Sequence, residues 1–181
     1  MAYDLSGKTI GFLVANEGIE QVELTEPWEA VTNAGATARL IAPELGTAQA
    51  FNHLDKADTF DVDVAVADAN VDDFDGLVLP GGVANPDALR LDHDAVRFVQ
   101  DFVAAGKPMG VICHAPWMLV EAGVLDGRTI TSWPSLKTDI ANAGGKWVDE
   151  EVVVDQGLVT SRNPGDLPAF NEKICHQFEG R

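Results

Sequence analysis

The sequence predicts an α/β fold in which a mostly parallel sheet carries helices on both faces. Short apolar runs alternate with helical segments along the chain, and this alternation is typical of βαβ units. The runs are continuously apolar, as expected for strands that are covered on both faces. The chain of 181 residues is long enough for a full core, and no repeat, low-complexity tract or linker divides it. We therefore expect one domain spanning residues 1–181.

The first half of the chain has a clear start and a less regular end. A Pro-Gly-Gly turn at residues 80–82 stops its last apolar run, and Asn33 and Gly35 stop its helix. Residues 44–75 form an irregular stretch, in which alternation around residues 59–64 favours a peripheral strand or hairpin. The other predicted elements are strands at 9–15, 37–42 and 77–79, a turn at 16–18 and a helix at 22–34.

The second half repeats the alternation. Gly106 and Gly123 are placed to end two helices, and Gln156-Gly157 lies between two β-rich runs, which indicates a hairpin. Asp166 is a candidate cap of the closing helix. The predicted elements are helices at 94–105, 116–122, 136–143 and 167–178, strands at 108–112 and 129–131, and a hairpin at 152–161.

Charge and composition restrict the partners and the setting. The net charge is −17, with 29 acidic against 12 basic residues. Because nucleic acids and anionic membranes bind positive surfaces, neither is expected as a partner. The acidic residues are spread along the chain, as on a protein from a high-salt cytosol. Two cysteines make no disulfide framework, no secretory signal is visible, and no window reaches the length of a membrane span, so we expect a cytoplasmic protein.

Cys113 is the first candidate for chemistry, because it lies where a buried strand turns into a helix. Parallel sheets bind ligands at the carboxyl ends of their strands, so the loops 16–21, 80–87 and 113–116 should converge. The free N–H groups of a helix N-terminus favour negative charge and should lower the pKa of a thiol there. The alternative is a buried, inert cysteine.

The motifs resemble the DJ-1/PfpI family, in its PfpI-type branch. They occur in family order over nearly the whole chain, and include Leu-Val-Leu-Pro-Gly-Gly at 77–82, Ala-Ala-Gly-Lys-Pro at 104–108, Val-Ile-Cys-His-Ala-Pro at 111–116 and Thr-Ser-Trp-Pro at 131–134. The resemblance implies a flavodoxin-like sandwich related to class I glutamine amidotransferase domains. It also implies a homo-dimer or a larger assembly of dimers.

The resemblance assigns roles to four side chains. Cys113 matches the reactive cysteine, Glu20 the carboxyl that hydrogen-bonds it, and His114 the proposed general acid or base. Asp87 matches the carboxylate that orients the histidine from an adjacent subunit. From the residues alone, Glu20 and Asp87 could equally be helix-start carboxylates and His114 a structural residue. Glu17 and Glu23 are expected to be solvated or capping groups.

Backbone groups and two departures complete the expected site. Gly81 and Gly82 form a turn, and the resemblance implies that the N–H groups of Gly82 and His114 make an oxyanion hole. Ala115 replaces a glycine that family members usually carry, so the turn after the cysteine should be altered if it needs positive φ. Trp133 stands where some relatives have Tyr, and indole cannot act as a phenolic acid or base.

No cofactor or metal is expected. The sequence has no phosphate-binding loop, no dinucleotide fingerprint and no metal-ligand spacing, and Cys175 on the last helix is expected to pack in the core. The resemblance implies a stress-response enzyme whose thiolate attacks electrophilic carbonyls, as an intracellular peptidase on peptides or a glyoxalase or deglycase on small reactive carbonyls. The alternative is a non-catalytic oxidative-stress sensor or chaperone that uses Cys113.

Overall fold

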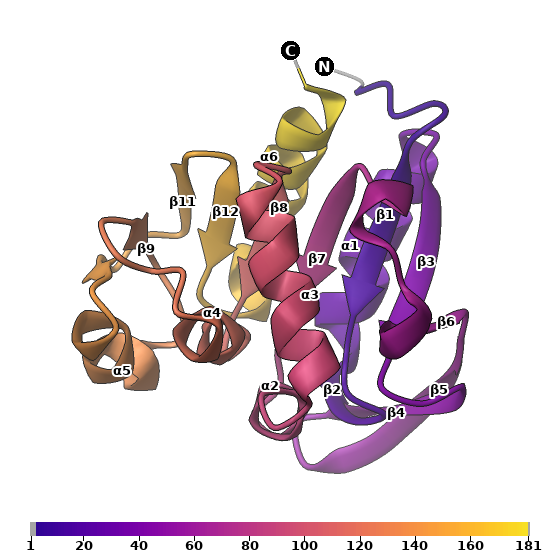
Figure 1. Ribbon diagram of the computed structural model, residues 1–181, viewed down its shortest axis with the longest axis horizontal. Helices are drawn as coiled ribbons and strands as arrows, with labels where there is room; N and C mark the ends of the chain where they lie inside the picture. Colours follow the sequence, from indigo (N-terminus) through magenta and orange to yellow (C-terminus); the bar gives the residue numbers. More distant parts are fainter. Residues whose placement is uncertain (1–2, 181) are drawn as a thin grey trace.

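A computed structural model describes residues 3–180 and confirms the predicted fold class (Figure 1). Its centre is a seven-stranded sheet in the order β11-β12-β8-β7-β1-β3-β6, in which only the β11–β12 pair is antiparallel. The strands are β1 (Thr9–Leu13), β2 (Glu17–Glu20), β3 (Thr37–Ala42), β4 (Gly46–Asn52), β5 (Asp55–Val62), β6 (Val64–Ala65), β7 (Gly76–Leu79), β8 (Met109–Ile112), β9 (Thr129–Ile130), β10 (Lys146–Trp147), β11 (Val152–Asp155) and β12 (Leu158–Ser161). The helices are α1 (Gln21–Asn33), α2 (Ala84–Leu89), α3 (His93–Ala104), α4 (Pro116–Ala122), α5 (Lys137–Asn142) and α6 (Leu167–Glu179).

Helices cover both faces of the sheet, as the continuous apolar strands predict. The strands β7, β8 and β12 are buried at every position. On one face they pack with α3 and α4, and on the other with α1 and α6, so the core consists of two hydrophobic layers separated by the sheet. Gly110 in β8 permits close packing of α6, because a Cβ there would lie 2.5 Å from Ile174 and 2.9 Å from Phe170.

Three local predictions need correction. The turn expected at 16–18 is the start of β2, which pairs with β4. The peripheral strand or hairpin expected around residues 59–64 is confirmed, as part of the β4–β5 hairpin. Residues 129–131 do not join the main sheet, since β9 pairs with β10 instead. Asp166 stands at the start of α6, but its carboxylate binds Arg162 rather than the helix N–H groups. The pairings of β2 with β4 and of β9 with β10 depend on partners that are distant in the sequence, which local patterns do not reveal. The partner of Asp166 lies only four residues away.

The chain reverses direction across the sheet at β1. The chain passes from β1 to β3 on one side of β1 and later adds β7 on the other side. The loops that follow β1 and β7 therefore leave the sheet in different directions. Such a switch point leaves a crevice at the carboxyl ends of the strands. Within residues 3–180, no helix has the length and apolar character needed to cross a membrane.

Candidate active site

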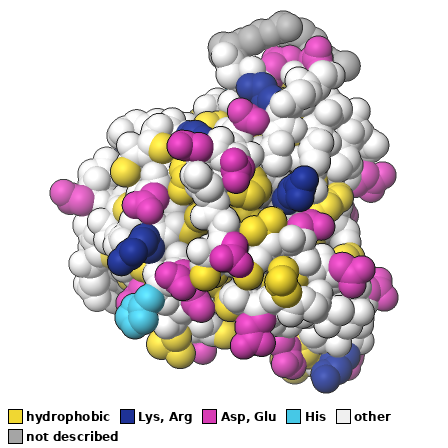
Figure 2. Space-filling view, turned by 45° about the vertical axis from the view of Figure 1, so that its right-hand side comes forward, with side chains coloured by type: hydrophobic (Ala, Val, Ile, Leu, Met, Phe, Trp, Pro, Cys, Tyr) yellow, Lys and Arg dark blue, Asp and Glu magenta, His cyan; other side chains and the backbone are white. Residues whose placement is uncertain are grey.

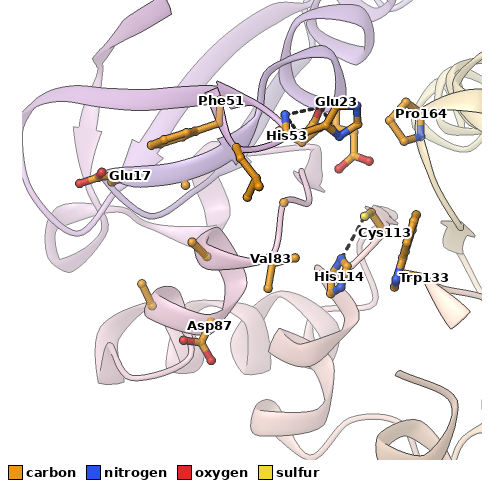
Figure 3. Close-up of a pocket in the computed structure, with 16 residues that line it drawn as sticks. Glu17, Glu23, Phe51, His53, Val83, Asp87, Cys113, His114, Trp133 and Pro164 are labelled. Atoms are coloured by element: carbon orange, nitrogen blue, oxygen red, sulfur yellow. Dashed lines mark hydrogen bonds and ion pairs between the residues drawn. The ribbon is translucent and has the colours of Figure 1, made fainter. Parts of the chain in front are cut away.

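A pocket of about 740 Å³ lies at this switch point (Figure 3). The three loops that were expected to converge do so: residues of the segments after β1, β7 and β8 all line it. The tip of the β4–β5 hairpin and the loop before α6 add further walls. The pocket therefore collects side chains from segments that are far apart in the sequence.

Cys113 lies in the pocket with a strained backbone. Its φ is +63°, a left-handed conformation that costs a non-glycine residue about 1 kcal/mol or more. The conformation is held from both sides, because the Cys113 N–H donates to the carbonyl of Ser161 at 3.1 Å and its carbonyl accepts from the N–H of Trp133 at 2.9 Å. Ala115 has a φ of −57°, so the turn needs no glycine there and the expected alteration is absent. The residue under strain is the cysteine itself.

The prediction that Glu20 lies against Cys113 is wrong, because Glu23 occupies that place. Glu23 is fully buried, and a Cβ on Gly81 would meet both its carboxyl group and, at 2.6 Å, the Cβ of Cys113. Glu20 lies just before α1 and its carboxylate accepts the backbone N–H of His53 at 3.1 Å. It lines the pocket but stands at the hairpin tip.

The helical period of α1 explains why Glu23, and not Glu20, lies against Cys113, and this period is visible in the sequence. The buried residues of α1 are Glu23, Leu24, Pro27 and Val31, which lie on one face of the helix. Glu23 is therefore a carboxyl on the apolar stripe, whereas Glu20 precedes the helix. A carboxyl whose spacing places it on the buried face of a helix is the signal that would have identified Glu23.

Burial governs the protonation of Glu23. Desolvation, followed by repulsion from Glu20, raises its pKa to about 8, although the Cys113 thiol and the N–H groups of Gly81 and Gly82 act to lower it. Among the described residues, neither carboxyl oxygen of Glu23 has a hydrogen-bond partner of ordinary geometry. At neutral pH the group is therefore mainly a neutral acid that can donate toward the sulfur.

The Cys113 thiol does not show the lowered pKa that its position at a helix start suggested. Burial raises its pKa, and a charged Glu23 would raise it further, while the N–H groups of Gly82 and His114 lower it. A protonated Glu23 removes the repulsion at neutral pH. The resting form of the buried pair is then a thiol beside a carboxylic acid, so the sulfur needs a proton acceptor when it reacts.

His114 is placed to be that acceptor. Its Nδ1 lies 3.2 Å from the Cys113 sulfur, and burial lowers its pKa, which favours the neutral imidazole. The ring lies between two indoles: Trp133 stacks on it at 5.5 Å between ring centroids, and Trp117 meets it edge-on at 5.3 Å. Trp117 is itself fixed by a hydrogen bond from its Nε1 to Asp139. The aromatic packing holds the imidazole toward the sulfur.

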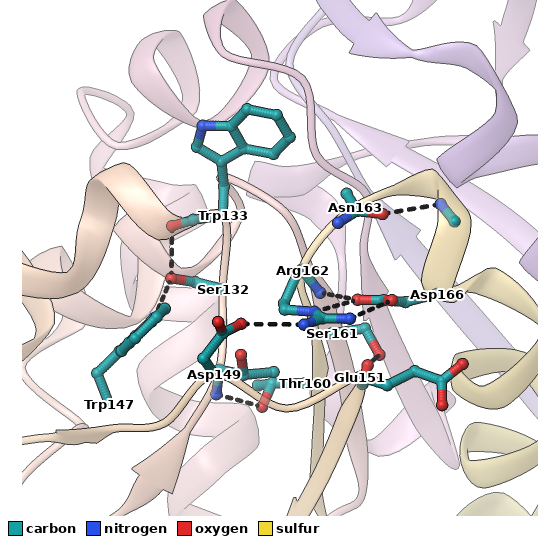
Figure 4. A network of polar contacts seen from close by, with 12 residues as sticks. Ser132, Trp133, Trp147, Asp149, Glu151, Thr160, Ser161, Arg162, Asn163 and Asp166 are labelled. Carbon is teal, nitrogen blue, oxygen red and sulfur yellow. Dashed lines mark hydrogen bonds and ion pairs between the residues drawn. The ribbon is translucent and has the colours of Figure 1, made fainter.

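A polar network behind the pocket holds Trp133 and the loop before α6 (Figure 4). The Trp147 indole N–H donates to the Ser132 hydroxyl at 3.0 Å, and this hydroxyl donates to the carbonyl of Trp133 at 2.8 Å. Arg162 makes a two-pronged contact with Asp166 and a further one with a third side chain, Asp149. These contacts fix two walls of the pocket from outside it.

Replacing Trp133 by Ala is expected to raise the pKa of His114 toward its ordinary value of 6.5, because the substitution uncovers the ring and desolvation is what lowers this pKa. NMR titration of the His114 ring protons measures the change directly. Trp133→Phe, which keeps an aromatic face over the ring, is the matched control and should shift the pKa less. An unchanged titration in the Ala variant would show that Trp133 does not shield the ring.

Asn85 is a positioning residue that no sequence pattern singled out. It is buried at the start of α2, where its side-chain amide donates to the carbonyls of Pro80 and Gly81, while its Oδ1 accepts the N–H of Ala15 at 2.7 Å. It thereby ties the end of β1 to the turn after β7. Gly82 in this turn has a φ of +90°, and its N–H faces the Cys113 sulfur, as does that of His114.

Asp87 lines the pocket but does not contact His114 within the chain. It is exposed on α2, on the side of the pocket away from Cys113 (Figure 3). Within residues 3–180 no cluster of three or more His, Cys, Asp or Glu side chains is arranged to hold a metal ion. Cys175 is buried among the residues packed under α6, as expected.

The chain matches known proteins over most of its length. A model of the DJ-1/PfpI family matches residues 8–177. The deglycase PfpI of Pyrococcus furiosus is 42% identical over 159 residues, which cover 88% of this chain and 92% of that protein. YraA of Bacillus subtilis, named as a candidate cysteine protease, is 39% identical over 166 residues, covering 92% of this chain and 95% of its own.

Solved structures show the same fold. DJ-1beta of Drosophila melanogaster superposes with a TM-score of 0.86 at 28% identity, covering 96% of this chain and 91% of that one. A two-domain protein of Anabaena variabilis with DJ-1/ThiJ/PfpI-like and ferritin-like domains gives a TM-score of 0.89 at 30% identity, covering 94% of this chain and 48% of that one.

Proposed function

The chain belongs to the DJ-1/PfpI family, and from this premise we propose that it is a cysteine-nucleophile enzyme of glyoxalase or deglycase type that acts on reactive carbonyls. The observation that carries the proposal is the strained Cys113, whose sulfur lies 3.2 Å from a neutral His114 inside a pocket of about 740 Å³. A nucleophile and a base within hydrogen-bond reach are the signature of covalent catalysis.

The proposed reaction begins with attack on an aldehyde carbon. The Cys113 sulfur bonds to the carbon, the thiol proton passes to His114, and the carbonyl electron pair moves to the oxygen. The N–H groups of Gly82 and His114 stabilise this oxygen. His114 then returns the proton to it, giving a hemithioacetal. With a dicarbonyl, transfer of the carbon-bound proton to the oxygen of the second carbonyl gives an enediol. Transfer of the proton on the first hydroxyl to the carbon of the second carbonyl then gives a thioester, which water hydrolyses to a 2-hydroxy acid and the free thiol.

The absence of a nearby orienting carboxylate favours aldehydes over peptides. Among the described residues, the polar and aromatic contacts of the His114 ring are the Cys113 sulfur and two indoles. Cleavage of an amide requires a proton for the leaving amine from a well-oriented acid, whereas addition to an aldehyde has no leaving group to protonate. Peptidase activity would therefore require a carboxylate from another subunit to orient His114.

The test is turnover of methylglyoxal by the purified protein. We expect production of lactate, reduced to the uncatalysed rate in Cys113→Ser, since the hydroxyl is a far weaker nucleophile. A peptide ester serves as the second substrate, and its cleavage without methylglyoxal turnover would favour the peptidase. Turnover that persists in the Ser variant would overturn the proposal.

A redox sensor is the second candidate, because Cys113 is a thiol at the base of an open pocket. Oxidation by peroxide to a sulfenic acid needs access and some thiolate. Stoichiometric oxidation of Cys113 at low peroxide, together with no turnover of any electrophile, would favour this candidate. The other cysteine, Cys175, is buried under α6 and is not an obvious resolving partner.

Assembly is part of the proposal for Asp87. Asp87 lies on α2 at the rim of the pocket. In an assembly of dimers its carboxylate would be available to the His114 of a neighbouring subunit. A structure of the assembly tests this, and a separation too great for a water-bridged contact would remove Asp87 from the site. We also propose that the enzyme works in the cytoplasm, as the absence of a disulfide framework suggests.

A further inference from the structure

The pocket is much larger than a small dicarbonyl. Its volume of about 740 Å³ falls in the range of pockets that enclose drug-sized ligands. Most of its wall beyond the cysteine is apolar, formed by Phe51, Leu54, Val83 and Trp133. A three-carbon substrate would leave most of this wall uncovered, so the pocket suits an electrophile carried on a larger apolar body.

In the described part of the chain, the carboxylates that line the pocket are not matched by cationic side chains. Glu17, Glu20 and Asp87 line it beside the buried Glu23, and among the described lining residues there is no Lys or Arg. The Glu20 carboxylate accepts the backbone N–H of His53, whose ring Nδ1 lies 3.8 Å away, and His114 lines the pocket as a second imidazole. Within residues 3–180, neither Glu17 nor Asp87 takes part in an ion pair.

The two uncompensated carboxylates lie at one end of the pocket. In Figure 3, Glu17 and Asp87 stand on the side away from Cys113, with Phe51 and Val83 nearer the middle. At the other end, Glu23 is fully buried, lines the pocket and has no hydrogen-bond partner of ordinary geometry among the described residues. The reactive end and the acidic rim thus bracket an apolar middle.

The pocket belongs to a strongly acidic protein. Acidic side chains are scattered over the face drawn in Figure 2, and the whole chain has a net charge of −17. A cleft lined by one sign of charge concentrates ligands of the opposite sign. The local carboxylates and the overall charge therefore act in the same direction, and an experiment has to separate them.

We propose that the pocket selects electrophilic carbonyl compounds that are apolar and positively charged at the end remote from the carbonyl, such as amine-bearing aldehydes, and rejects carboxylated ones. Glu17 is a specificity-determining residue in this arrangement. The inference rests on the proposed function for its substrate chemistry, but the charge preference is a property of access to Cys113. It can therefore be measured without turnover.

The experiment labels Cys113 with two methanethiosulfonates of similar size, one carrying a trimethylammonium group and one a sulfonate. Each forms a disulfide with the cysteine and releases methanesulfinate. Rates are normalised to free cysteine, and the labelled site is identified by mass spectrometry with Cys113→Ser as the blank. At low ionic strength we expect the cationic reagent to react at least about tenfold faster, and salt to reduce this ratio.

Two charge-matched variants locate the source of the preference. Glu17→Gln should lower the cation-to-anion ratio roughly two- to five-fold, the range of one exposed charge pair. Asp101→Asn changes the net charge equally from an exposed position on α3 outside the pocket, and should leave the ratio unchanged. A ratio near one in the unsubstituted protein, or equal losses in both variants, would overturn the proposal.

Turnover supplies a second, independent measurement. If the protein converts aryl glyoxals, phenylglyoxal should have a higher kcat/KM than its 4-carboxy derivative, and Glu17→Gln should narrow the gap. If the unsubstituted protein turns over neither glyoxal but keeps the expected cation-to-anion labelling ratio, only the proposed function is contradicted. Turnover of both glyoxals at equal kcat/KM would contradict the charge preference alone.

Discussion

At pH 7, Glu23→Leu should react with iodoacetamide at Cys113 about 10- to 100-fold more slowly than the unsubstituted protein. The pKa of Glu23 is raised to about 8, so the carboxyl is mainly protonated at this pH and can donate to the thiolate as it forms. A hydrogen bond to a charged group contributes about 1.5–3 kcal/mol, which corresponds to the expected change in rate. Leu has a similar volume but no donor.

Glu20→Gln is the matched control, because Glu20 lines the same pocket but contacts His53 rather than the sulfur. Its labelling rate should stay within about twofold of the unsubstituted value, because the Glu20 carboxylate makes no hydrogen bond to the sulfur and acts on it only through space. The advantage conferred by Glu23 should also shrink as the pH rises through about 8, where the carboxylate begins to repel the thiolate. A large loss in Glu20→Gln, with none in Glu23→Leu, would restore Glu20 to the site.

Glu23→Gln should make the protein more stable, and increasingly so as the pH rises from about 4.5 to 8. The carboxyl keeps its proton in the folded protein up to about pH 8, whereas the unfolded chain loses it near 4.5. Because the folded state binds the extra proton in this window, the free energy of unfolding of the unsubstituted protein falls by up to about 1.4 kcal/mol per pH unit from this group. Gln carries no such proton.

Urea unfolding of both proteins at several pH values measures the difference. The two should be closest near pH 4, where Glu23 is protonated in both states, and should differ by several kcal/mol at pH 8, an order-of-magnitude figure. Glu20→Gln removes the repulsion that is the second cause of the raised pKa of Glu23, so its free energy of unfolding should fall less steeply over this range than that of the unsubstituted protein. A flat difference for Glu23→Gln would mean that the buried carboxyl is ionised in the folded protein. Together, the two Glu23 variants would show that the buried carboxyl raises the reactivity of Cys113 and lowers the stability of the folded protein.

The sheet and the position of Cys113 were readable from the sequence for a simple reason. Strands buried on both faces must be continuously apolar, and the runs at β1, β7 and β8 are bounded by glycine or proline. The strand-to-helix turn at Cys113 follows from the proline that starts α4. The hairpin at Gln156 was likewise local, and the structure has it as β11 and β12.

The partners of Cys113 were not readable in the same way. Three carboxylates at positions 17, 20 and 23 lie three residues apart, and the choice among them depends on where α1 begins and which face it buries. The conformation of Cys113 depends on hydrogen bonds to Ser161 and Trp133, each from a segment distant in sequence. Such facts belong to packing, which no local pattern encodes.

The sequence by itself determined an α/β sheet, a cysteine at the carboxyl end of β8 and a net charge of −17, because apolar runs, turn residues and net charge are local or additive properties. Only the tertiary structure decided that Glu23 rather than Glu20 lies against the sulfur and that two indoles enclose His114. The physical reason is that burial sets the protonation of the carboxyl, the thiol and the imidazole, and burial exists only when distant segments close around them.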